Sequence, residues 1–286
     1  LEEVFEISER FTIIRNGELA ASLPTSELDR KKFSYFMTGR EFEDTRFTAP
    51  AITAEPVLEV DRLSLAGGFE DISFQLCPGE IVGITGLLGS GRTELALALF
   101  GALRPESGEI RLKGEPVSFG GVRDAIDAGI GYVPEDRLTE GLFLPRSIGD
   151  NIVISEIDNA AVTRGIYDEG RKRKEAQRWI DELRIAAHDQ DNPANTLSGG
   201  NQQRVVLAKW LATNPTVLIL NGPTVGVDIG SKHDIHQILQ DLAGRGMAVI
   251  VISDDIPEVI GNCNRILLMK SGRIVAELDP ATTTEA

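Results

Sequence analysis

"GEIVGITGLLGSGRTELALALFG", residues 79–101, runs from an apolar segment through a glycine-rich loop into a helical pattern. Residues 79–85 are typical of a buried strand, and 93–101 predict a helix with Gly101 available as its C-terminal cap. A loop between a strand and a helix N-terminus can bind phosphate, because backbone N–H groups and the positive end of the helix meet there. A glycine-rich turn without a ligand is the alternative. The strand, the helix and Thr93 together favour a phosphate loop.

Each residue of this loop is a candidate for cofactor binding. The glycines allow a tight turn, Arg92 can reach terminal phosphates, and Thr93 can ligand Mg²⁺. The pattern G-x-x-x-x-G-K-[ST] is met except that arginine replaces lysine. The candidate residues are Gly86, Leu87, Leu88, Gly89, Ser90, Gly91, Arg92 and Thr93.

A second glycine motif, "LSGGNQQR" at 197–204, opens another predicted helix that runs from about residue 201 to 212. The Ser198 hydroxyl can reach a phosphate oxygen, and the helix N-terminus favours an anion. A helix cap alone would need only the serine. Gly199 and Gly200 therefore indicate a close backbone approach to a ligand.

A third stretch, "VLILNGPTVGVD" at 217–228, raises a conflict between two interpretations. Residues 217–220 predict a short buried strand of the kind that often delivers an acidic pair to a phosphate site, yet Asn221 and Gly222 follow it. An Asn-Gly pair after an apolar run is also typical of a type I′ hairpin turn. The Pro-Thr and "GVD" that follow, with the glycine motif upstream, favour a strand at the phosphate site.

The two ends of the chain carry an internal repeat. Residues 1–21 align without gaps with 256–276, and the identical pairs are Glu3 with Glu258, Val4 with Val259, Arg10 with Arg265, Gly17 with Gly272, and Ala21 with Ala276. Chance would supply roughly one identity over such a window. Both copies predict a short helix, a strand, a tight turn at Asn16-Gly17 or Ser271-Gly272, and a returning strand. If the second copy closes a domain, the first closes another domain upstream.

From Val57 onward, continuous Val/Ile runs alternate with helical patterns, which is typical of parallel strands covered on both faces. We predict an α/β domain at 57–286 with a central, mostly parallel sheet. Residues 1–37 are predicted to be the C-terminal tail of a preceding domain. Residues 38–56 are polar, contain two prolines and lack periodicity, so they predict a linker.

Composition narrows the function classes. The net charge of −15 argues against nucleic-acid binding as the main function, although a small positive pocket is compatible with it. Cys77 and Cys263 lack CxxC spacing, and the three histidines, His188, His233 and His236, form no ligand pattern. No apolar run approaches the roughly 20 residues of a membrane-spanning helix. We therefore expect no metal cluster and no membrane span.

In this order and spacing, the three motifs make nearly the whole chain resemble an ATP-binding subunit of an ABC transporter. "LSGGNQQ" together with "VPEDR" at 133–137 is similar to the second nucleotide-binding domain of monosaccharide importers of the ribose, galactose and xylose type. The resemblance implies a P-loop NTPase fold of ABC type, with an antiparallel β subdomain and a helical subdomain at about 136–196 that touches the membrane permease. The implied cofactors are ATP and Mg²⁺, sandwiched between the phosphate loop of one domain and the signature of the other.

The resemblance also implies partners and site residues. The partners would be the upstream nucleotide-binding domain of the same polypeptide and the sugar permease, which would place the chain in the cytoplasm at the inner face of the membrane. The implied site residues are Gly86 to Thr93 as Walker A, Glu135 at the Q-loop position, Ser198 to Gly200 as the signature, Asp228 as the D-loop acid, and Phe69 as the nearest aromatic residue for stacking on adenine.

Four positions depart from the family pattern. Asn221 and Gly222 stand where Walker B has its aspartate and the catalytic glutamate, and Asp254 replaces the switch histidine. Arg92 replaces the Walker A lysine, and a planar guanidinium cannot reproduce the geometry of an ammonium group. Asparagine brings no charge to a cation, and glycine offers no base. Asp254 or Asp255 can instead cap the helix that contains Pro257.

The family is one of ATP hydrolases, but these departures predict that this domain by itself hydrolyses ATP poorly or not at all. We expect weak nucleotide binding at its own loop, and we expect its signature to complete the site of the upstream domain. Two alternatives remain open. One is a non-transport ABC ATPase acting on ribosomes or DNA, against which the charge counts. The other is a nucleotide-sensing interaction module without turnover.

Overall fold

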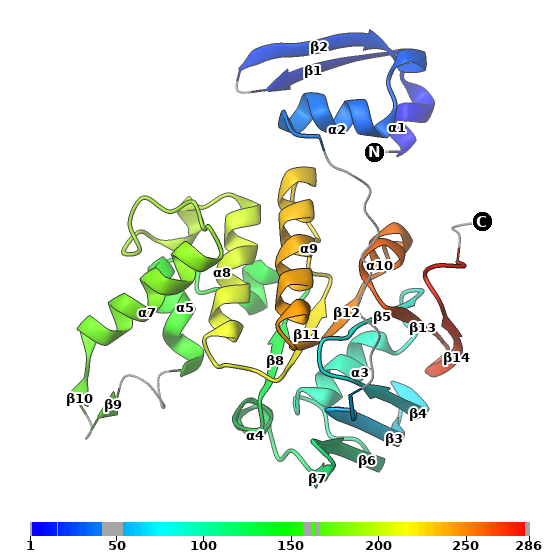
Figure 1. Cartoon of the computed structure of the whole chain (residues 1–286), viewed down its shortest axis with the longest axis vertical. Helices are drawn as coiled ribbons and strands as arrows, with labels where there is room; N and C mark the ends of the chain where they lie inside the picture. Colours follow the sequence, from blue (N-terminus) through cyan, green and yellow to red (C-terminus); the bar gives the residue numbers. More distant parts are fainter. Residues whose placement is uncertain (1, 16, 42–53, 157–161, 164–165, 284–286) are drawn as a thin grey trace.

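The computed structural model describes residues 2–15, 17–41, 54–156, 162–163 and 166–283. Its elements form two groups, an N-terminal unit of residues 2–41 and a main domain of residues 54–283 (Figure 1). Residues 42–53, most of the predicted linker, lie outside the described residues. None of the described helices is long and apolar enough to cross a bilayer.

The N-terminal unit is a helix, a hairpin and a second helix around a small aromatic core. Its elements are α1 (Glu2–Ile7), β1 (Arg10–Arg15), β2 (Glu18–Pro24), the 3-10 turn η1 (Thr25–Glu27) and α2 (Arg30–Thr38). The rings of Phe5, Phe11 and Phe33 pack together with centroids 4.7–5.7 Å apart. The predicted order of helix, strand and returning strand is confirmed here, while Asn16 of the predicted turn lies outside the described residues.

A six-stranded sheet forms the centre of the main domain, with the order β14-β13-β5-β12-β11-β8. All neighbouring strands are parallel except β13 and β14. The strands are β5 (Ile81–Gly86), β8 (Ile130–Val133), β11 (Val217–Asn221), β12 (Ala248–Ile252), β13 (Arg265–Lys270) and β14 (Arg273–Leu278). Every residue of β8, β11 and β12 is buried, as expected for continuous apolar runs covered on both faces.

A four-stranded antiparallel sheet, with the order β4-β3-β6-β7, forms the predicted β subdomain. Its strands are β3 (Leu58–Leu65), β4 (Phe69–Leu76), β6 (Ser107–Leu112) and β7 (Glu115–Val117). Helix α3 (Arg92–Leu99) contacts β4 of this sheet as well as β5 and β11 of the central sheet, so it lies between the two sheets. Gly101 ends the helix as predicted, because its N–H and that of Ala102 bond the carbonyls of Ala98 and Leu97.

The helical subdomain lies between β8 and the helix that begins at Gly199, and it is the left-hand part of Figure 1. It contains η2 (Arg137–Gly141), α5 (Ile148–Val153), η3 (Ile154–Glu156), the short strands β9 (Val162–Thr163) and β10 (Ile166–Tyr167), α7 (Glu169–Glu182) and η4 (Ala194–Thr196). The remaining helices are α4 (Val122–Asp127), α8 (Gly199–Leu211), α9 (Ile229–Gly244) and α10 (Ile256–Asn262).

The repeat seen in the sequence is also present in the structure. In both copies a helix precedes an antiparallel hairpin, and both hairpins contain a register shift at the same aligned position, between Ile13 and Ile14 in one and between Leu268 and Met269 in the other. Ser271 and Gly272 both have positive φ, at 50° and 77°, as a type I′ turn requires. A shared irregularity indicates equivalent elements, because a bulge is a local feature that a chance hairpin would not reproduce.

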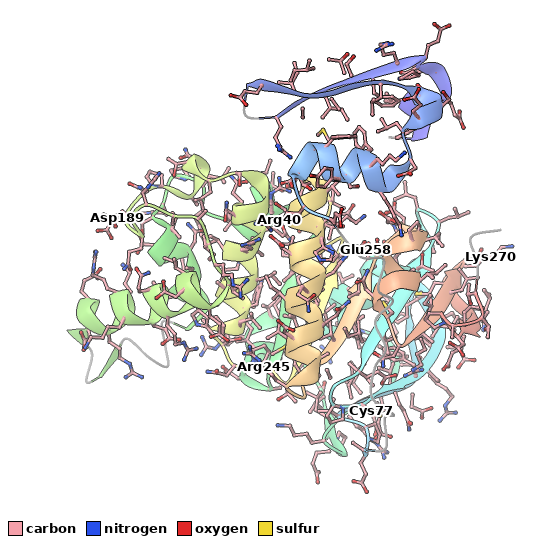
Figure 2. All side chains as sticks on the ribbon, turned by 45° about the horizontal axis from the view of Figure 1, so that its top comes forward. Arg40, Cys77, Asp189, Arg245, Glu258 and Lys270 are labelled. Atoms are coloured by element: carbon pink, nitrogen blue, oxygen red, sulfur yellow. The ribbon has the colours of Figure 1, made fainter. Side chains whose placement is uncertain are left out.

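The N-terminal unit packs on the start of α9. Ile229, the first residue of α9, lies against the aromatic core of the unit. Arg40, just beyond α2, contacts the Asp234 carboxylate at 3.6 Å (Figure 2). Asp234 also accepts a hydrogen bond from Arg204 of α8 at 2.5 Å. These contacts connect the N-terminal unit to α9 and, through Asp234, to α8, the helix that begins at the second glycine motif.

Candidate functional site

The phosphate loop, Gly86–Thr93, lies at the carboxyl end of β5. The strand order changes direction here, since β12, β11 and β8 lie on one side of β5 while β13 and β14 lie on the other. Ligands of open α/β sheets bind at such switch points. A Cβ on Gly86 or Gly91 would overlap the carbonyl oxygen of Met269 or Gly68, respectively, so close packing requires glycine at both positions.

The N-terminus of α3 is open toward the loop. Its N-cap residue, Gly91, provides no side-chain hydrogen bond to the first turn, and the Ser198 side chain does not cap α8 either. By contrast, aspartates cap α2, α7 and α9, the other described helices of eight residues or more. The first N–H groups of an uncapped helix have no intrahelical partner. Among the described helices of eight residues or more, α3 and α8 are therefore the two whose N-termini are open to an anion, and each begins at one of the two predicted glycine motifs.

Polar groups behind the loop are also unsatisfied. The Ser90 hydroxyl is buried, with the residue 4 % exposed, and it has no hydrogen-bond partner among the described residues. The Thr85 hydroxyl near the end of β5 is also buried and also has no hydrogen-bond partner among the described residues. Buried hydroxyls normally have a partner, and together with the open helix end they show that the residues present fit a phosphate group.

Arg92 does not point freely into the site. One guanidinium nitrogen donates to the Gly86 carbonyl at 2.6 Å, and another lies 3.5 Å from the Asp254 carboxylate. The Arg92 side chain is 10 % exposed, whereas that of Asp254 is 75 % exposed. Two of the four departures from the family pattern, the arginine and the switch aspartate, are thus in contact with each other.

Asn221 is the last residue of β11 and Gly222 follows it; β11 is parallel to both of its neighbours, which excludes the hairpin interpretation for this pair. Asn221 is 4 % exposed, and burial raises the pKa of the neighbouring Tyr132 hydroxyl, an effect that the Asn221 side chain partly offsets. Gly222 has a φ of +60°, and a Cβ there would lie 2.9 Å from a Val225 methyl carbon and 3.0 Å from Cγ of Glu135. A glutamate at this position would be strained in the present backbone.

The signature residues lie at the start of α8, close to the segment that follows β11. A Cβ on Gly199 would lie 2.9 Å from the Arg137 guanidinium, and a Cβ on Gly200 would overlap the Ser231 hydroxyl. Arg137 donates to the carbonyls of Val225 and Gly226 at 2.8 and 3.1 Å. Arg137 belongs to the "VPEDR" stretch but was not itself predicted as a site residue. It joins the helical subdomain to the segment before Asp228.

The other implied site residues have different surroundings. Asp228 is exposed and caps α9, which begins at Ile229, by accepting from the Ser231 amide and hydroxyl at 3.0 and 2.6 Å. Partial burial acts to raise the pKa of Asp228, but these hydrogen bonds outweigh it and lower the pKa. Glu135 is exposed beside Gly222. Phe69 is 3 % exposed and packs in the main core, and it also lines a cavity that adjoins Gly89 of the phosphate loop, so the stacking of its ring on adenine stays a prediction.

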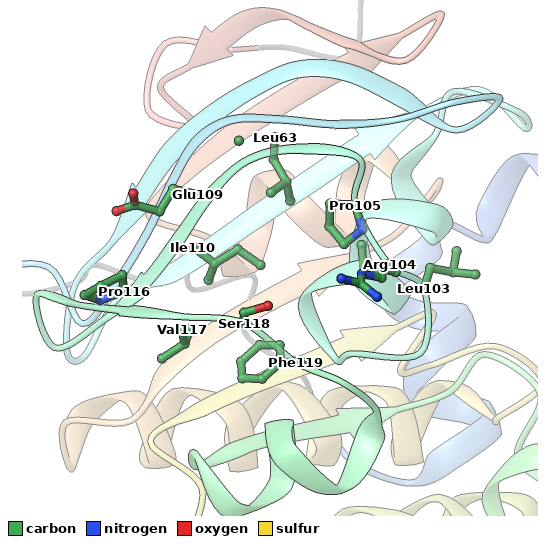
Figure 3. Close-up of a pocket in the computed structure, with 12 residues that line it drawn as sticks. Leu63, Leu103, Arg104, Pro105, Glu109, Ile110, Pro116, Val117, Ser118 and Phe119 are labelled. Carbon is green, nitrogen blue, oxygen red and sulfur yellow. The ribbon is translucent and has the colours of Figure 1, made fainter.

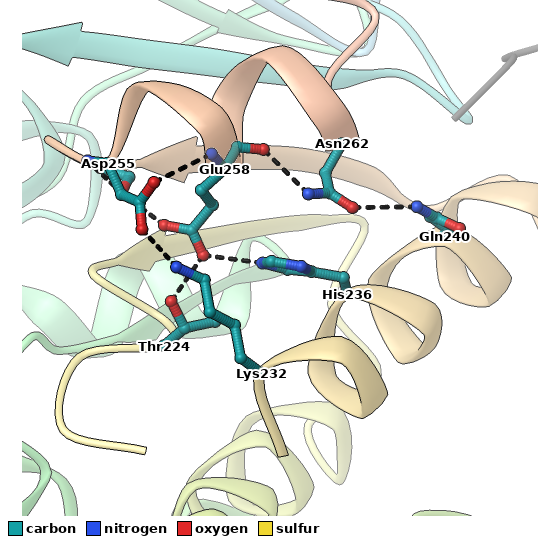
Figure 4. Close-up of polar contacts among 8 residues, drawn as sticks. Thr224, Lys232, His236, Gln240, Asp255, Glu258 and Asn262 are labelled. Carbon is teal, nitrogen blue, oxygen red and sulfur yellow. Dashed lines mark hydrogen bonds and ion pairs between the residues drawn. The ribbon is translucent and has the colours of Figure 1, made fainter. Parts of the chain in front are cut away.

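A buried carboxylate network beside the site was not predicted. Glu258 of α10 is 3 % exposed and accepts hydrogen bonds from the Thr224 hydroxyl at 2.7 Å and the Ser253 hydroxyl, while His236 Nε2 lies 2.7 Å away (Figure 4). Burial acts to raise the pKa of Glu258, but the bonds from His236, Ser253 and Thr224 outweigh it and lower the pKa below 4.5. The network ties the segment after β11 to α9 and to the segment after β12.

Asp255 caps α10 by accepting from the Glu258 amide at 3.1 Å, which confirms one of the two predicted caps. Its carboxylate also pairs with Lys232 of α9. Sequence patterns could have pointed to Glu258, because it is one of the identical positions of the repeat. Its partner His236 belongs to no ligand pattern in the sequence, and nothing local in the sequence indicates that the two side chains meet.

Donors for Mg²⁺ are few at this site. The part of the chain that the structure describes contains no group of three or more His, Cys, Asp or Glu side chains that could hold a metal ion. Thr93 is half-buried at the start of α3 and Asn221 is neutral, so the residues at the Walker positions provide no carboxylate. Mg²⁺ prefers carboxylate and phosphate oxygens. A metal here would depend on the nucleotide's own phosphates and the Thr93 hydroxyl.

One cavity lies apart from these residues. It measures about 370 Å³ and is lined by β6, β7 and the connection after α3, including Arg104, Glu109 and Phe119 (Figure 3). None of the predicted site residues lines it. A second cavity, of about 440 Å³, is lined by Gly67 and Gly68 between β3 and β4, by Phe69 and Glu70 of β4, by Gly89 of the phosphate loop, and by Gly272. The second cavity is the one that adjoins the site.

Comparison with known proteins agrees with the fold and the motifs. A family model described as ABC transporter matches residues 69–225. A ribose import ATP-binding protein of Streptomyces avermitilis is 40% identical over 285 residues, covering 100% of this chain and 56% of that protein. An arabinose import ATP-binding protein of Azospirillum brasilense is 41% identical over 285 residues, covering 99% of this chain and 55% of that protein. The chain spans about half the length of these relatives.

Solved structures share the fold. A nucleotide-free ATP-binding cassette from an ABC transporter superimposes with a TM-score of 0.69 at 21% identity, covering 79% of this chain and 92% of the other. A dimeric cassette in a post-hydrolysis state, bound to ADP and phosphate, gives a TM-score of 0.67 at 23% identity and covers 78% of this chain and 98% of the other. The predicted α/β fold of ABC type is confirmed. The family model matches more than half of this chain, so the chain belongs to the ABC transporter family.

Proposed function

We propose that this chain is a nucleotide-binding domain of a monosaccharide importer, and that it assists ATP hydrolysis at a partner domain rather than hydrolysing ATP itself. One observation carries the proposal. The signature helix start at Ser198–Gly200 is open, while the positions that need an acid or a base hold Asn221, Gly222 and Asp254. The relatives named for ribose and arabinose import support the substrate class.

The phosphate loop supports nucleotide binding by this domain. The open end of α3 and the unsatisfied Ser90 hydroxyl provide donors for phosphate oxygens. The missing carboxylates weaken metal binding, and without a base near Gly222 no side chain at that position can activate water. We expect weak binding of MgATP and MgADP and no productive turnover at this loop.

The partner domain would be the one that ends in the first copy of the repeat. In the second copy, β13 pairs with the phosphate-loop strand β5 on one side and with β14 on the other. In the first copy, β1 pairs only with β2 among the described residues. Ile14 is 65 % exposed, while Met269, its aligned counterpart, is 1 % exposed. A preceding domain that supplies a parallel strand beside β1 would bury this edge.

The permease is the other proposed partner, and it would hold the chain at the cytoplasmic face of the membrane. The net charge of −15 disfavours the alternative of an ATPase that acts on nucleic acid. A module that senses nucleotide without turnover fits this chain taken alone. Adding the upstream domain would distinguish it from the importer subunit, because only the importer subunit should then hydrolyse ATP.

A single-turnover assay with MgATP tests the proposal. The 286-residue chain should show no hydrolysis above background, and the same chain joined to its upstream domain should hydrolyse ATP. In that longer polypeptide, Ser198→Ala with Gly199→Ala should reduce turnover, whereas Gly261→Ala, a position with open space around it, should leave turnover unchanged. Clear hydrolysis by the chain alone that is abolished by Arg92→Ala would refute the proposed division of labour.

A further inference from the structure

The phosphate loop has two distinct ends. On the β13 side it adjoins the cavity of about 440 Å³, lined by Gly68 and Glu70 of the antiparallel sheet, Gly89 of the loop, and Gly272 of the β13–β14 turn. On the β12 side lies Asp254, two residues after that strand. Since β5 lies between β13 and β12 in the sheet, the cavity and Asp254 lie on opposite sides of the loop, and a ligand that crosses the loop from the cavity approaches Asp254.

The size of the cavity suits the bulky end of a nucleotide, and the loop suits its phosphates. A nucleoside in the cavity would place its first phosphates over the open N–H groups of α3. Ligand sites of this kind measure about 300–1,000 Å³. The phosphate chain would then end at the Arg92 guanidinium, which Asp254 already contacts at 3.5 Å.

We propose that this loop selects nucleoside diphosphates over triphosphates, because the Asp254 carboxylate lies at the end of the loop where a third phosphate would be. The inference rests on the proposed nucleotide binding. Two phosphates can use the helix end and Arg92 while Asp254 keeps its contact. A third phosphate must displace the carboxylate or lie beside it with like charge.

Neighbouring residues do not offset that repulsion. Asn221 and Gly222 carry no charge that could hold a cation between the third phosphate and Asp254. Lys232, on the helix that faces this segment, pairs with Asp255 instead. The Asp254 side chain is 75 % exposed, so a water-like dielectric applies, and one added unit charge at about 4 Å then weakens binding about fivefold.

Isothermal titration of MgADP and MgATP into the chain tests the selectivity. The wild-type chain should bind MgADP about fivefold or more tightly than MgATP. Asp254→Asn should bring the two dissociation constants within about twofold by improving MgATP binding. Asp241→Asn is the control. It removes the same charge from an exposed position near the end of α9 that leads into β12, at the sheet edge opposite the phosphate loop, so the wild-type ratio should remain.

The outcomes separate this inference from the proposed function. Equal affinities in the wild-type chain, or an unchanged ratio in Asp254→Asn, would overturn the selectivity while leaving nucleotide binding in place. Binding of neither nucleotide to the wild-type chain would overturn both, since the loop would then have no nucleotide to select. The ratio of the MgADP and MgATP dissociation constants is measured in the wild-type chain itself, so a folding defect in Asp254→Asn does not affect that test.

Discussion

Replacing Glu258 tests the structural role of the buried carboxylate network. The carboxylate is 3 % exposed and accepts from Thr224 and Ser253, with His236 Nε2 at 2.7 Å. Each hydrogen bond to a charged acceptor contributes about 1.5–3 kcal/mol, and the cost of burying the carboxylate offsets part of that sum. We expect Glu258→Ala to lower the free energy of unfolding by about 3–5 kcal/mol. Glu258→Gln keeps an acceptor and should lose about 1–3 kcal/mol.

Urea unfolding followed by circular dichroism measures these losses. The control is Glu277→Ala, because the Glu277 side chain is 57 % exposed and its ion pair with Arg265 should contribute no more than about 1 kcal/mol. A loss of less than about 1 kcal/mol in Glu258→Ala, or one equal to that of Glu277→Ala, would show that the network does not stabilise the fold.

The same variants give a pH test. The pKa of Glu258 is lowered below 4.5 in the folded chain, so its contribution to stability is present above that pH and is lost as the pH falls through the folded-state pKa. Stability measured from pH 5 down to pH 3 should therefore fall more steeply in the wild-type chain than in Glu258→Gln. Equal slopes would contradict the lowered pKa.

Three further predictions concern single positions. Burial lowers the pKa of Lys209 from 10.5 to about 8 in the folded chain. Between about pH 8 and 10.5 this lysine is therefore protonated more in the unfolded chain than in the folded chain, so its contribution to stability rises with pH over that range. Lys209→Met should remove that rise, at most about 3 kcal/mol, in urea unfolding at pH 8 and 10. Arg137→Lys removes the pair of hydrogen bonds to the carbonyls of Val225 and Gly226, so we expect the free energy of unfolding to fall by about 1–2 kcal/mol. Amide hydrogen exchange in that segment should also become faster, and unchanged exchange would contradict this role. Gly222→Ala should cost about 1–3 kcal/mol because of its φ of +60°, whereas Gly244→Ala, with open space around it, should cost nothing.

The elements of this protein could largely be predicted from local patterns. The strand, loop and helix around Gly86–Thr93 were all placed correctly, because apolar runs and glycine positions depend on nearby residues alone. Boundaries were less accurate. Apolar residues recur at helical spacing over 169–187, a pattern that would extend one helix over the whole range. The helix α7 nevertheless ends at Glu182, and Arg184 adopts a φ of +50°. The apolar stripe continues past the helix end because Leu183 is also buried, so periodicity alone could not locate the end.

The sequence by itself determined the α/β class, the repeat, and the four positions that depart from the family pattern. Only the tertiary structure decided what those positions do. Arg92 and Asp254 are far apart in the chain and meet because β5 and β12 are neighbours in the sheet. Glu258 and His236 meet because α9 and α10 flank adjacent strands, and Phe69 turns inward to the core. Such pairings depend on strand order and burial, which are properties of the whole packed chain and leave no local signal in the sequence.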